Sequence, residues 1–320
     1  MKFSIAVVFL SLLLAGCGGS MGGGVDYSVP TYRSPRANVH ETFARDFRIT
    51  NKAGASVIPS DPNGEHPFGV LLVFVGGDRF KQCSATHLVS GKVVTNAHCI
   101  DASVSASNYF LVFYDKYGRK TYAKASSIGF VGTEGKTDFA VVHIGRTDAD
   151  RWDTAGSYIK DTSSLIDGTV PRDTFGVTIW SFDPGSAHGQ PVEVSVWNPN
   201  RCKGSRTLPK ADGVDILGTK TKLTFAAKTS RDVIVDQCDR ETIGGNSGSL
   251  VTETGTFANK IGVFWGGYVW TTKNQANYDH LKYTGNRGVE ETRRPTVGQM
   301  IFNMVTEFGY LRDNETTGVF

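Results

Sequence analysis

The stretch Phe68-Gly69-Val70-Leu71-Leu72-Val73-Phe74-Val75, closed by Gly76-Gly77-Asp78, sets the pattern of the chain. It is rich in residues that favour strands, and it ends in a turn signal. Similar short runs follow at Lys92 to Thr95, Tyr109 to Tyr114, Phe139 to Ile144, Val192 to Trp197, Lys222 to Ala226 and Lys260 to Trp265. Short strands that recur without helical patterns between them are typical of β-sandwiches and β-barrels. We therefore expect an all-β body.

The composition is typical of a folded globular protein and gives no indication of a nucleic-acid or cofactor partner. The chain has 320 residues, of which 39% are hydrophobic and 20% charged, enough for a sizeable core. The 37 glycines against 11 prolines favour tight turns between short strands. With 34 basic and 31 acidic residues the net charge is only +3, so no nucleic-acid partner is expected. No convincing phosphate loop or dinucleotide fingerprint occurs, so no cofactor is expected.

The N-terminus carries an export signal. Lys2 precedes an apolar run from Phe3 to Leu14 that is too short to span a membrane. The sequence Leu14-Ala15-Gly16-Cys17 resembles the lipobox of bacterial lipoproteins, which implies that residues 1–16 are removed and that Cys17 anchors the protein in a membrane through lipid. Gly18 takes the place of the Asp that often marks inner-membrane retention, which favours the outer membrane. An ordinary signal peptide, giving a periplasmic or secreted protein, is the alternative.

The rest of the chain divides into a tether and a body. After Cys17, residues up to 66 are glycine-rich and then polar with scattered prolines, which predicts a flexible tether and a stalk or pro-region. The body covers residues 67–320. A helix is expected over 296–311, beginning with a capping box of Thr296 and Gln299. Its apolar face, at steps of three and four, would be Val297, Met300, Ile301, Met304, Val305, Phe308 and Leu311.

Three motifs carry chemistry only when they are taken together. They are Val93-Val94-Thr95-Asn96-Ala97-His98-Cys99, Thr137-Asp138-Phe139-Ala140-Val141-Val142 and Gly244-Gly245-Asn246-Ser247-Gly248-Ser249-Leu250-Val251. Singly, each has an ordinary interpretation: core packing or half of a metal site for the first, a turn for the second, a hairpin loop for the third. A serine nucleophile, however, needs a general base, an acid that orients the base, and donors for the oxyanion. His98, Asp138 and Ser247 supply these parts in that order.

These motifs resemble those of the trypsin/chymotrypsin superfamily of serine endopeptidases. Thr95–Cys99 is similar to the family's Thr-Ala-Ala-His-Cys, with Asn96 in place of the first Ala, and Asp138–Val141 is similar to its Asp-hydrophobic-Ala-hydrophobic strand. Gly245–Ser249 departs from Gly-Asp-Ser-Gly-Gly-Pro and resembles the Gly-Asn-Ser-Gly-Ser of the bacterial V8-like, or glutamyl endopeptidase, branch. The resemblance covers about residues 67–311 and is loose over 145–220.

The resemblance implies two antiparallel six-stranded β-barrels, a chymotrypsin-like double barrel with a C-terminal α-helix and the site between the barrels. The first barrel would cover about 67–150 and the second about 170–294. Ser247 would be the nucleophile, His98 the general base and then acid, and Asp138 the group that orients His98; the N–H groups of Gly245 and Ser247 would form the oxyanion hole. The implied activity is hydrolysis of protein or peptide substrates. Two alternatives remain: an ester substrate, and an inactive protease-like binding lipoprotein of the cell envelope.

The cysteines fit an exported domain. Besides Cys17 there are four, a number that suits two disulfides. A metal site is less favoured, because no CxxC occurs. The resemblance implies a Cys83–Cys99 bridge beside the catalytic histidine, which leaves Cys202 and Cys238 as the second pair.

Two segments of the sequence are expected to select the substrate side chain. Gly262–Gly267 resembles the strand that lines the family's primary pocket, which gives Phe264, Trp265 and Gly266 as substrate-binding residues. Phe264 stands where V8-like enzymes carry a glutamate-binding His, and an apolar ring cannot compensate a buried carboxylate. Glu241 lies where trypsin-like members keep the acid of the pocket base, so it is either a site for a basic residue or a solvated loop residue.

Activation is expected to differ from that of pancreatic-type members. There the Asp before the nucleophile pairs with a new N-terminal amine after cleavage. Here Asn246 is neutral, and no Ile-Val-Gly-Gly start precedes Phe68. Activation by that salt bridge is therefore not expected.

Overall fold

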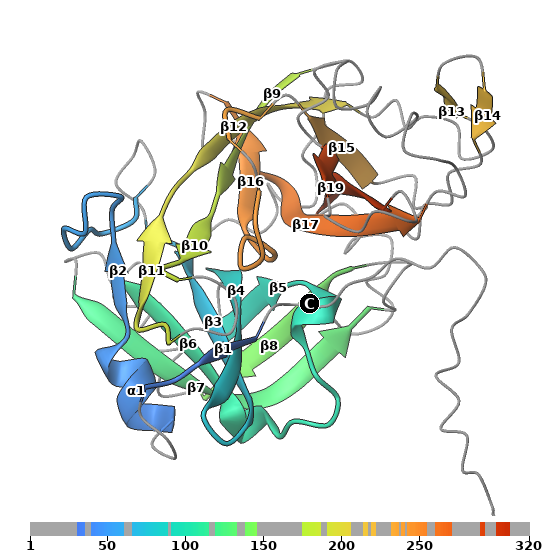
Figure 1. Cartoon of the computed structure of the whole chain (residues 1–320). Coiled ribbons are helices and arrows are strands. Elements are labelled where there is room, and N and C mark those ends of the chain that lie inside the picture. The colour runs from blue at the N-terminus through green and yellow to red at the C-terminus, as the bar shows by residue number, and fades with distance from the viewer. Residues whose placement is uncertain are drawn as a thin grey trace, which may run out of the picture.

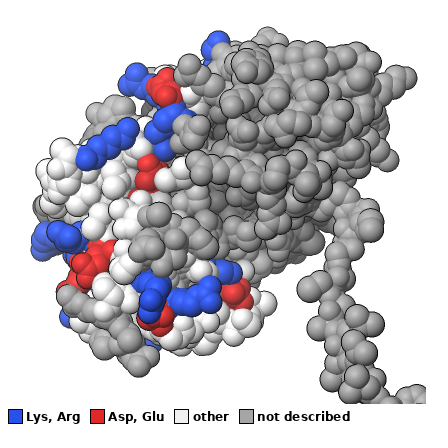
Figure 2. Space-filling model, in the orientation of Figure 1, with Lys and Arg blue, Asp and Glu red and all other residues white. Residues whose placement is uncertain are grey.

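The computed structural model of the chain describes residues 31–35, 40–60, 66–88, 91–114, 119–132, 138–145, 175–186, 191–205, 214–216, 219–221, 232–236, 238–240, 242–254, 260–270, 289–291 and 299–307. Within these ranges the protein is mostly strands (Figure 1). None of the helices in these ranges is long and apolar enough to cross a membrane. The described charges of both signs are interspersed on the face in Figure 2, in agreement with the small net charge.

The first barrel is a closed ring of six antiparallel strands. Its order is β4-β3-β6-β7-β8-β5, and β5 pairs back onto β4 to close it. The strands are β3 (Phe68–Gly76), β4 (Arg79–His87), β5 (Lys92–Thr95), β6 (Tyr109–Tyr114), β7 (Lys120–Val131) and β8 (Ala140–Ile144). Two short 3-10 helices, η2 (Ala97–Cys99) and η3 (Ala106–Asn108), lie between β5 and β6.

The wall of this barrel is buried on both faces. Successive side chains of a strand point to opposite sides. Val70, Leu72 and Phe74 of β3 accordingly join one buried cluster, while Leu71 and Val73 join the other. The near-continuous apolar run that marked this strand in the sequence therefore reflects burial on both of its faces.

The second barrel is also a closed ring of six antiparallel strands. Its order is β15-β12-β9-β16-β17-β19, and β15 pairs with β19 to close it. The strands are β9 (Phe175–Trp180), β12 (Asn200–Ser205), β15 (Asp232–Asp236), β16 (Leu250–Glu253), β17 (Lys260–Trp270) and β19 (Gln299–Glu307), with β18 (Val289–Glu291) added to β19. The all-β fold with two six-stranded barrels is thus confirmed. A separate hairpin pairs β13 (Val214–Ile216) with β14 (Thr219–Thr221).

The C-terminal helix predicted over 296–311 is wrong where the structure describes it. Gln299–Glu307 is strand β19, which pairs with β17 along its whole length and also with β15 and β18. In a short apolar run, periodicity alone does not separate helix from strand. Here the strand closes the second barrel and so removes two open sheet edges. Residues 296–298 and 308–311 lie outside the described residues.

The stalk expected before residue 67 is also wrong for residues 31–35 and 40–50, which pack onto the first barrel. β1 (Thr31–Arg33) extends the sheet beside β4, and α1 (His40–Asp46) lies against the outside of the barrel (Figure 1). Phe43, Ala44, Phe47 and Ile49 are each 2% exposed or less and belong to the same buried cluster as Phe74. Their polar neighbours hide this anchor in the sequence.

A small third sheet joins this N-terminal segment to the second half of the chain. β2 (Arg48–Thr50) pairs in parallel with β11 (Val194–Trp197), which pairs with β10 (Phe182–Pro184). β10 follows β9 of the second barrel directly and also contacts β4 of the first. The N-terminal segment, the first barrel and the β10 segment that follows the first strand of the second barrel are therefore packed together.

Candidate active site

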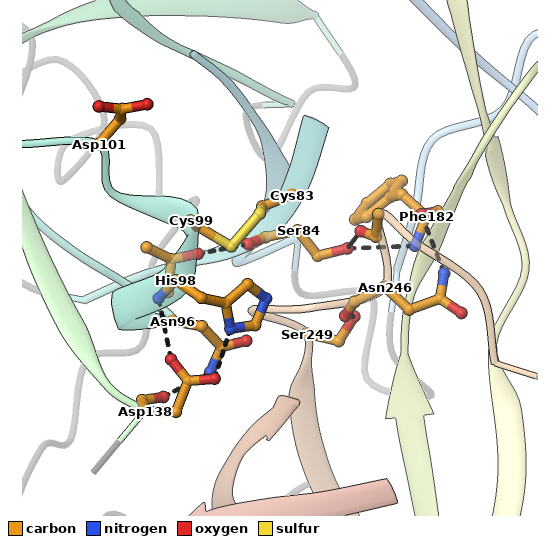
Figure 3. The surroundings of a disulfide bond; sticks show 12 residues. Cys83, Ser84, Asn96, His98, Cys99, Asp101, Asp138, Phe182, Asn246 and Ser249 are labelled. Carbon is orange, nitrogen blue, oxygen red and sulfur yellow. Dashed lines mark hydrogen bonds and ion pairs between the residues drawn. A yellow bond between two sulfur atoms is a disulfide. The ribbon is translucent and has the colours of Figure 1, made fainter. Parts of the chain in front are cut away.

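His98 and Asp138 form a buried pair at the end of the first barrel. His98 lies on η2, directly after β5, and is 8% exposed; Asp138 precedes β8 and is fully buried. One carboxylate oxygen of Asp138 accepts from the backbone N–H of His98 at 3.0 Å, and the other contacts Nδ1 of the ring (Figure 3). An ionised carboxylate in this position keeps the proton on Nδ1 and fixes the orientation of the ring.

Asn96 stabilises this pair through a hydrogen bond to the backbone of Asp138. Its side-chain Nδ2 donates to the backbone carbonyl of Asp138 at 2.6 Å, and Asn96 is fully buried. The Asn that replaces Ala in the motif therefore ties the end of β5 to the start of β8.

Both predicted disulfides are present. Cys83–Cys99 links β4 to η2 with a Cα–Cα distance of 6.3 Å, and Cys202–Cys238 joins β12 to the segment after β15. Because Cys99 follows His98, the first bridge restrains the histidine. The donor atoms of Cys83, His98 and Cys99 lie within 4.8 Å of one another, but the disulfide engages both sulfurs.

The Ser247 loop is shaped by two glycines with left-handed backbone. Gly245 has φ +105° and Gly248 has φ +88°, values that favour glycine. A Cβ at 245 would lie 2.8 Å from the Cδ of Pro184, and one at 248 would overlap the carbonyl oxygen of Ser84. The loop is thus pressed against β10 on one side and β4 on the other.

Ser84 of β4 docks this loop onto the first barrel. Its N–H donates to the carbonyl of Ser247 at 2.7 Å, and its hydroxyl donates to the carbonyl of Gly245 at 2.9 Å. On the far side, the N–H of Gly248 donates to the carbonyl of Phe264. None of the hydrogen bonds described for this region uses the N–H of Gly245 or Ser247. Figure 3 shows Asp138 on one side of the His98 ring and the loop of Asn246 and Ser249 on the other.

Asn246 is held by residues that the sequence motifs did not reveal. Its side chain is fully buried, and Oδ1 accepts from the N–H of Ile243 at 3.0 Å. Nδ2 donates to the carbonyl of Phe182 at 3.1 Å and to the carboxylate of Asp183 at 2.7 Å. Asp183 lies 63 residues away in the chain, so no local spacing could have indicated the contact.

Asp183 is itself held by Arg240. The two side chains form an ion pair with an N–O distance of 3.3 Å, and both are largely buried. Burial lowers the pKa of the Arg240 guanidinium, and the charge of Asp183 opposes that shift. Burial, with a contribution from Asp183, also raises the pKa of the Tyr32 hydroxyl to about 12. Tyr32 of the N-terminal segment therefore lies within the electrostatic reach of the same carboxylate.

The substrate-binding residues expected on β17 are part of the barrel wall. Phe264 and Trp265 are 2% and 1% exposed, and Phe264 packs with Val177 and Ile179 in the core of the second barrel. β17 continues to Trp270, whereas its pairing with β16 ends at Val263. In the described part of the chain no strand pairs with that edge of β17 over Gly266–Trp270. Glu241 and Cys17 lie outside the described residues.

Comparisons with known proteins give structural likeness only. No protein-family model and no curated protein matches the chain. Among solved structures, the chain is similar to the scabies mite inactivated protease paralogue S-D1, with 13% identity, a TM-score of 0.46, and coverage of 81% of this chain and 96% of that one. It is also similar to the scabies mite paralogue S-I1, with 12% identity, a TM-score of 0.45, and coverage of 78% and 92%. At this level of likeness, the fold is defined by the strand pairings and not by these neighbours.

Proposed function

We propose that the protein is a serine endopeptidase related to the V8-like branch of the trypsin/chymotrypsin superfamily. The observation that carries the proposal is the buried His98–Asp138 pair beside the Ser247 loop, which Ser84 docks onto the same barrel. A hydroxyl nucleophile, an oriented imidazole and two backbone N–H donors for the oxyanion are the parts that acyl transfer needs.

In the proposed reaction, Oγ of Ser247 attacks the scissile carbonyl carbon while its proton moves to Nε2 of His98. Asp138 stabilises the imidazolium, and the N–H groups of Gly245 and Ser247 donate to the oxyanion. His98 then gives the proton to the leaving amine, and the C–N bond breaks to leave an acyl-enzyme. Water, deprotonated by His98, attacks the acyl carbon. His98 then returns this proton to Oγ of Ser247 as the C–O bond breaks, which releases the acid and restores both residues. The Ser247–His98 hydrogen bond is expected to form in the substrate complex.

An extended peptide is the substrate class that the site supports best. The edge of β17 over Gly266–Trp270, which pairs with no strand in the described part of the chain, can hydrogen-bond an added strand, and backbone pairing of this kind gives affinity with little dependence on sequence. The buried side chains of Phe264 and Trp265 stiffen this edge without contacting the solvent. A glutamyl preference is not proposed, because Phe264 offers no group that could pair with a carboxylate.

We place the protein on the cell envelope, anchored by a lipid on Cys17 and facing an oxidising compartment. Two disulfides accord with export. The outer membrane is the proposed destination, and a periplasmic or secreted form is the alternative.

A second candidate function is an inactive, protease-like binding lipoprotein. The intact set of His98, Asp138 and Ser247 argues against it, because a binding module has no need of all three.

Cleavage of a peptide library by the full chain tests the proposal. Cleavage that disappears in Ser247→Ala is expected, and the products identify the residue preferred before the cut. Ester substrates tested in parallel separate a peptidase from an esterase. A folded wild type that hydrolyses neither class contradicts the proposal.

A further inference from the structure

We infer that Asp183, anchored by Arg240, positions Asn246 and thereby holds the oxyanion loop Gly245–Ser247 in its working shape without any new N-terminus. This inference rests on the proposed function and deepens it, because it assigns a residue set to the step that proteolytic activation performs in pancreatic-type relatives. Asp183 and Arg240 are positioning residues, since neither would touch the substrate.

The side chain of Asn246 is fixed from three directions. It accepts from the N–H of Ile243, three residues earlier in the loop, and donates to both Phe182 and Asp183 of β10. All of its amide hydrogens and its carbonyl oxygen are therefore engaged in a fully buried position. The backbone of Asn246 also donates to the carbonyl of Ile243 and accepts from Ser249. A residue held this way fixes the peptide groups on both sides of it. The peptide after Asn246 carries the N–H of Ser247, and the peptide before it carries the carbonyl of Gly245, whose own N–H is the other proposed donor.

The carboxylate that binds Asn246 is held in turn. Asp183 pairs with Arg240 at 3.3 Å and accepts from the Asn198 side chain at 2.5 Å. Arg240 also donates to the hydroxyl of Ser181 at 2.7 Å and to the carbonyl of Asn198. A buried ion pair that makes several further hydrogen bonds keeps a fixed geometry, and removal of one partner leaves an uncompensated charge.

The hydrogen-bonding needs of Asn246 are opposite to those of the Asp that pancreatic-type family members carry before the nucleophile. An Asp before the nucleophile needs a cation, which a newly cut N-terminus can supply. An Asn before the nucleophile needs an acceptor, and Asp183 supplies one from β10. The positive charge is then Arg240, which is part of the intact chain. The loop can therefore be ordered as soon as the protein folds.

A double-mutant cycle at positions 183 and 246 tests the inference in the full chain. Asn246→Asp keeps the shape of the side chain but sets a second carboxylate against Asp183, so kcat should fall about 100-fold, as for loss of an oxyanion donor, with KM little changed. Adding Asp183→Asn removes one of the two like charges and should recover at least about tenfold of kcat, because contacting residues couple. Asp78→Asn, which breaks a separate Asp–Arg pair with Arg33 on the first barrel, is the matched control and should leave kcat unchanged.

The outcomes distinguish a failure of the positioning role of Asp183 from a failure of the proposed endopeptidase activity. Wild-type kcat in Asn246→Asp, or a double variant no faster than Asn246→Asp, overturns the inference while the proposed function stands. A loss of kcat that follows a loss of folding, monitored by thermal unfolding, counts against positioning unless Asp183→Asn restores both. An inactive but folded wild type overturns the proposed function itself.

Discussion

The N–H of Ser84 donates to the carbonyl oxygen of Ser247 at 2.7 Å, and this hydrogen bond joins the two barrels at the proposed nucleophile. Ser84 follows Cys83, whose disulfide leads to Cys99 and so to His98. The general base and the nucleophile, which are far apart in the sequence, are thus restrained by neighbouring residues of one strand.

Ser84→Ala should lower both stability and activity. The hydroxyl of Ser84 donates to the carbonyl of Gly245 and accepts from the N–H of Phe182 at 3.4 Å, so its removal leaves buried polar groups without a partner. We expect a loss of about 1–3 kcal/mol in unfolding free energy and a lower kcat. Ser126→Ala, which removes an exposed hydroxyl bonded to the carbonyl of His143, is the control and should change neither quantity. Equal effects of the two substitutions would refute this role for Ser84.

Gly248→Ala should be far more harmful than Gly54→Ala. Both glycines have positive φ, at +88° and +79°, so both substitutions incur backbone strain of about 1–2 kcal/mol. Only at Gly248 does a Cβ also collide with the backbone of Ser84, whereas nothing lies within 4 Å at Gly54. Chemical denaturation should show the larger loss for Gly248→Ala, and kcat should fall in that variant alone. Equal losses would mean that the loop does not press on β4.

Asp138→Asn should abolish most turnover while the fold persists. The substitution keeps the volume of a fully buried side chain but removes the carboxylate that contacts Nδ1 and the N–H of His98. In triads of this type such a change costs about 10⁴ in kcat. Steady-state kinetics and circular dichroism measure the two effects, and full activity in a folded variant would remove Asp138 from the mechanism.

Deletion of residues 1–30 should be tolerated, whereas deletion through residue 66 should not. Phe43, Phe47 and Ile49 are buried against the first barrel, and loss of each removes about 2 kcal/mol of hydrophobic stabilisation. The longer deletion is therefore expected to unfold the protein or to lower its melting temperature sharply. A sharp rise in activity from near zero after removal of residues before 67 would instead identify an inhibitory pro-region.

Tyr32→Phe should reduce the loss of stability at alkaline pH. Burial and Asp183 raise the pKa of Tyr32 from 10.0 to about 12, so the folded state favours the neutral phenol. The raised pKa contributes stability that is complete below pH 10 and is lost as the pH rises towards 12, about 3 kcal/mol for a shift of this size. Unfolding free energies of wild type and Tyr32→Phe at pH 9 and pH 12 measure the difference. Parallel pH profiles would contradict the burial of the Tyr32 hydroxyl beside Asp183.

The sequence predicted those features that depend on local pattern. The runs at Phe68, Lys92, Tyr109 and Phe139 form β3, β5, β6 and, from Ala140, β8, because each is an apolar stretch bounded by turn residues. Both disulfides followed from a resemblance to a known family. The run Lys222 to Ala226 lies outside the described residues.

Features set by distant contacts could not be predicted. Met300, Ile301, Met304 and Val305 fit a helical face equally well, and only the unpaired edges of β15 and β17 make the strand the better solution. The anchor of the N-terminal segment consists of a few aromatic residues in a polar stretch. Asp183 and Arg240 lie in no recognisable sequence motif. Their contacts with Asn246 and with each other exist only because the fold brings β10 against the loop before Ser247.

A fluorophosphonate probe reports directly on whether Ser247 is an activated nucleophile. The full wild-type chain, at neutral pH and without prior cleavage, should react at one serine, which peptide mass spectrometry should identify as Ser247. Labelling should vanish in Ser247→Ala and persist in Ser126→Ala. Folded wild-type protein that takes up no probe, or a label mapped to another serine, would contradict the assignment of an active serine endopeptidase.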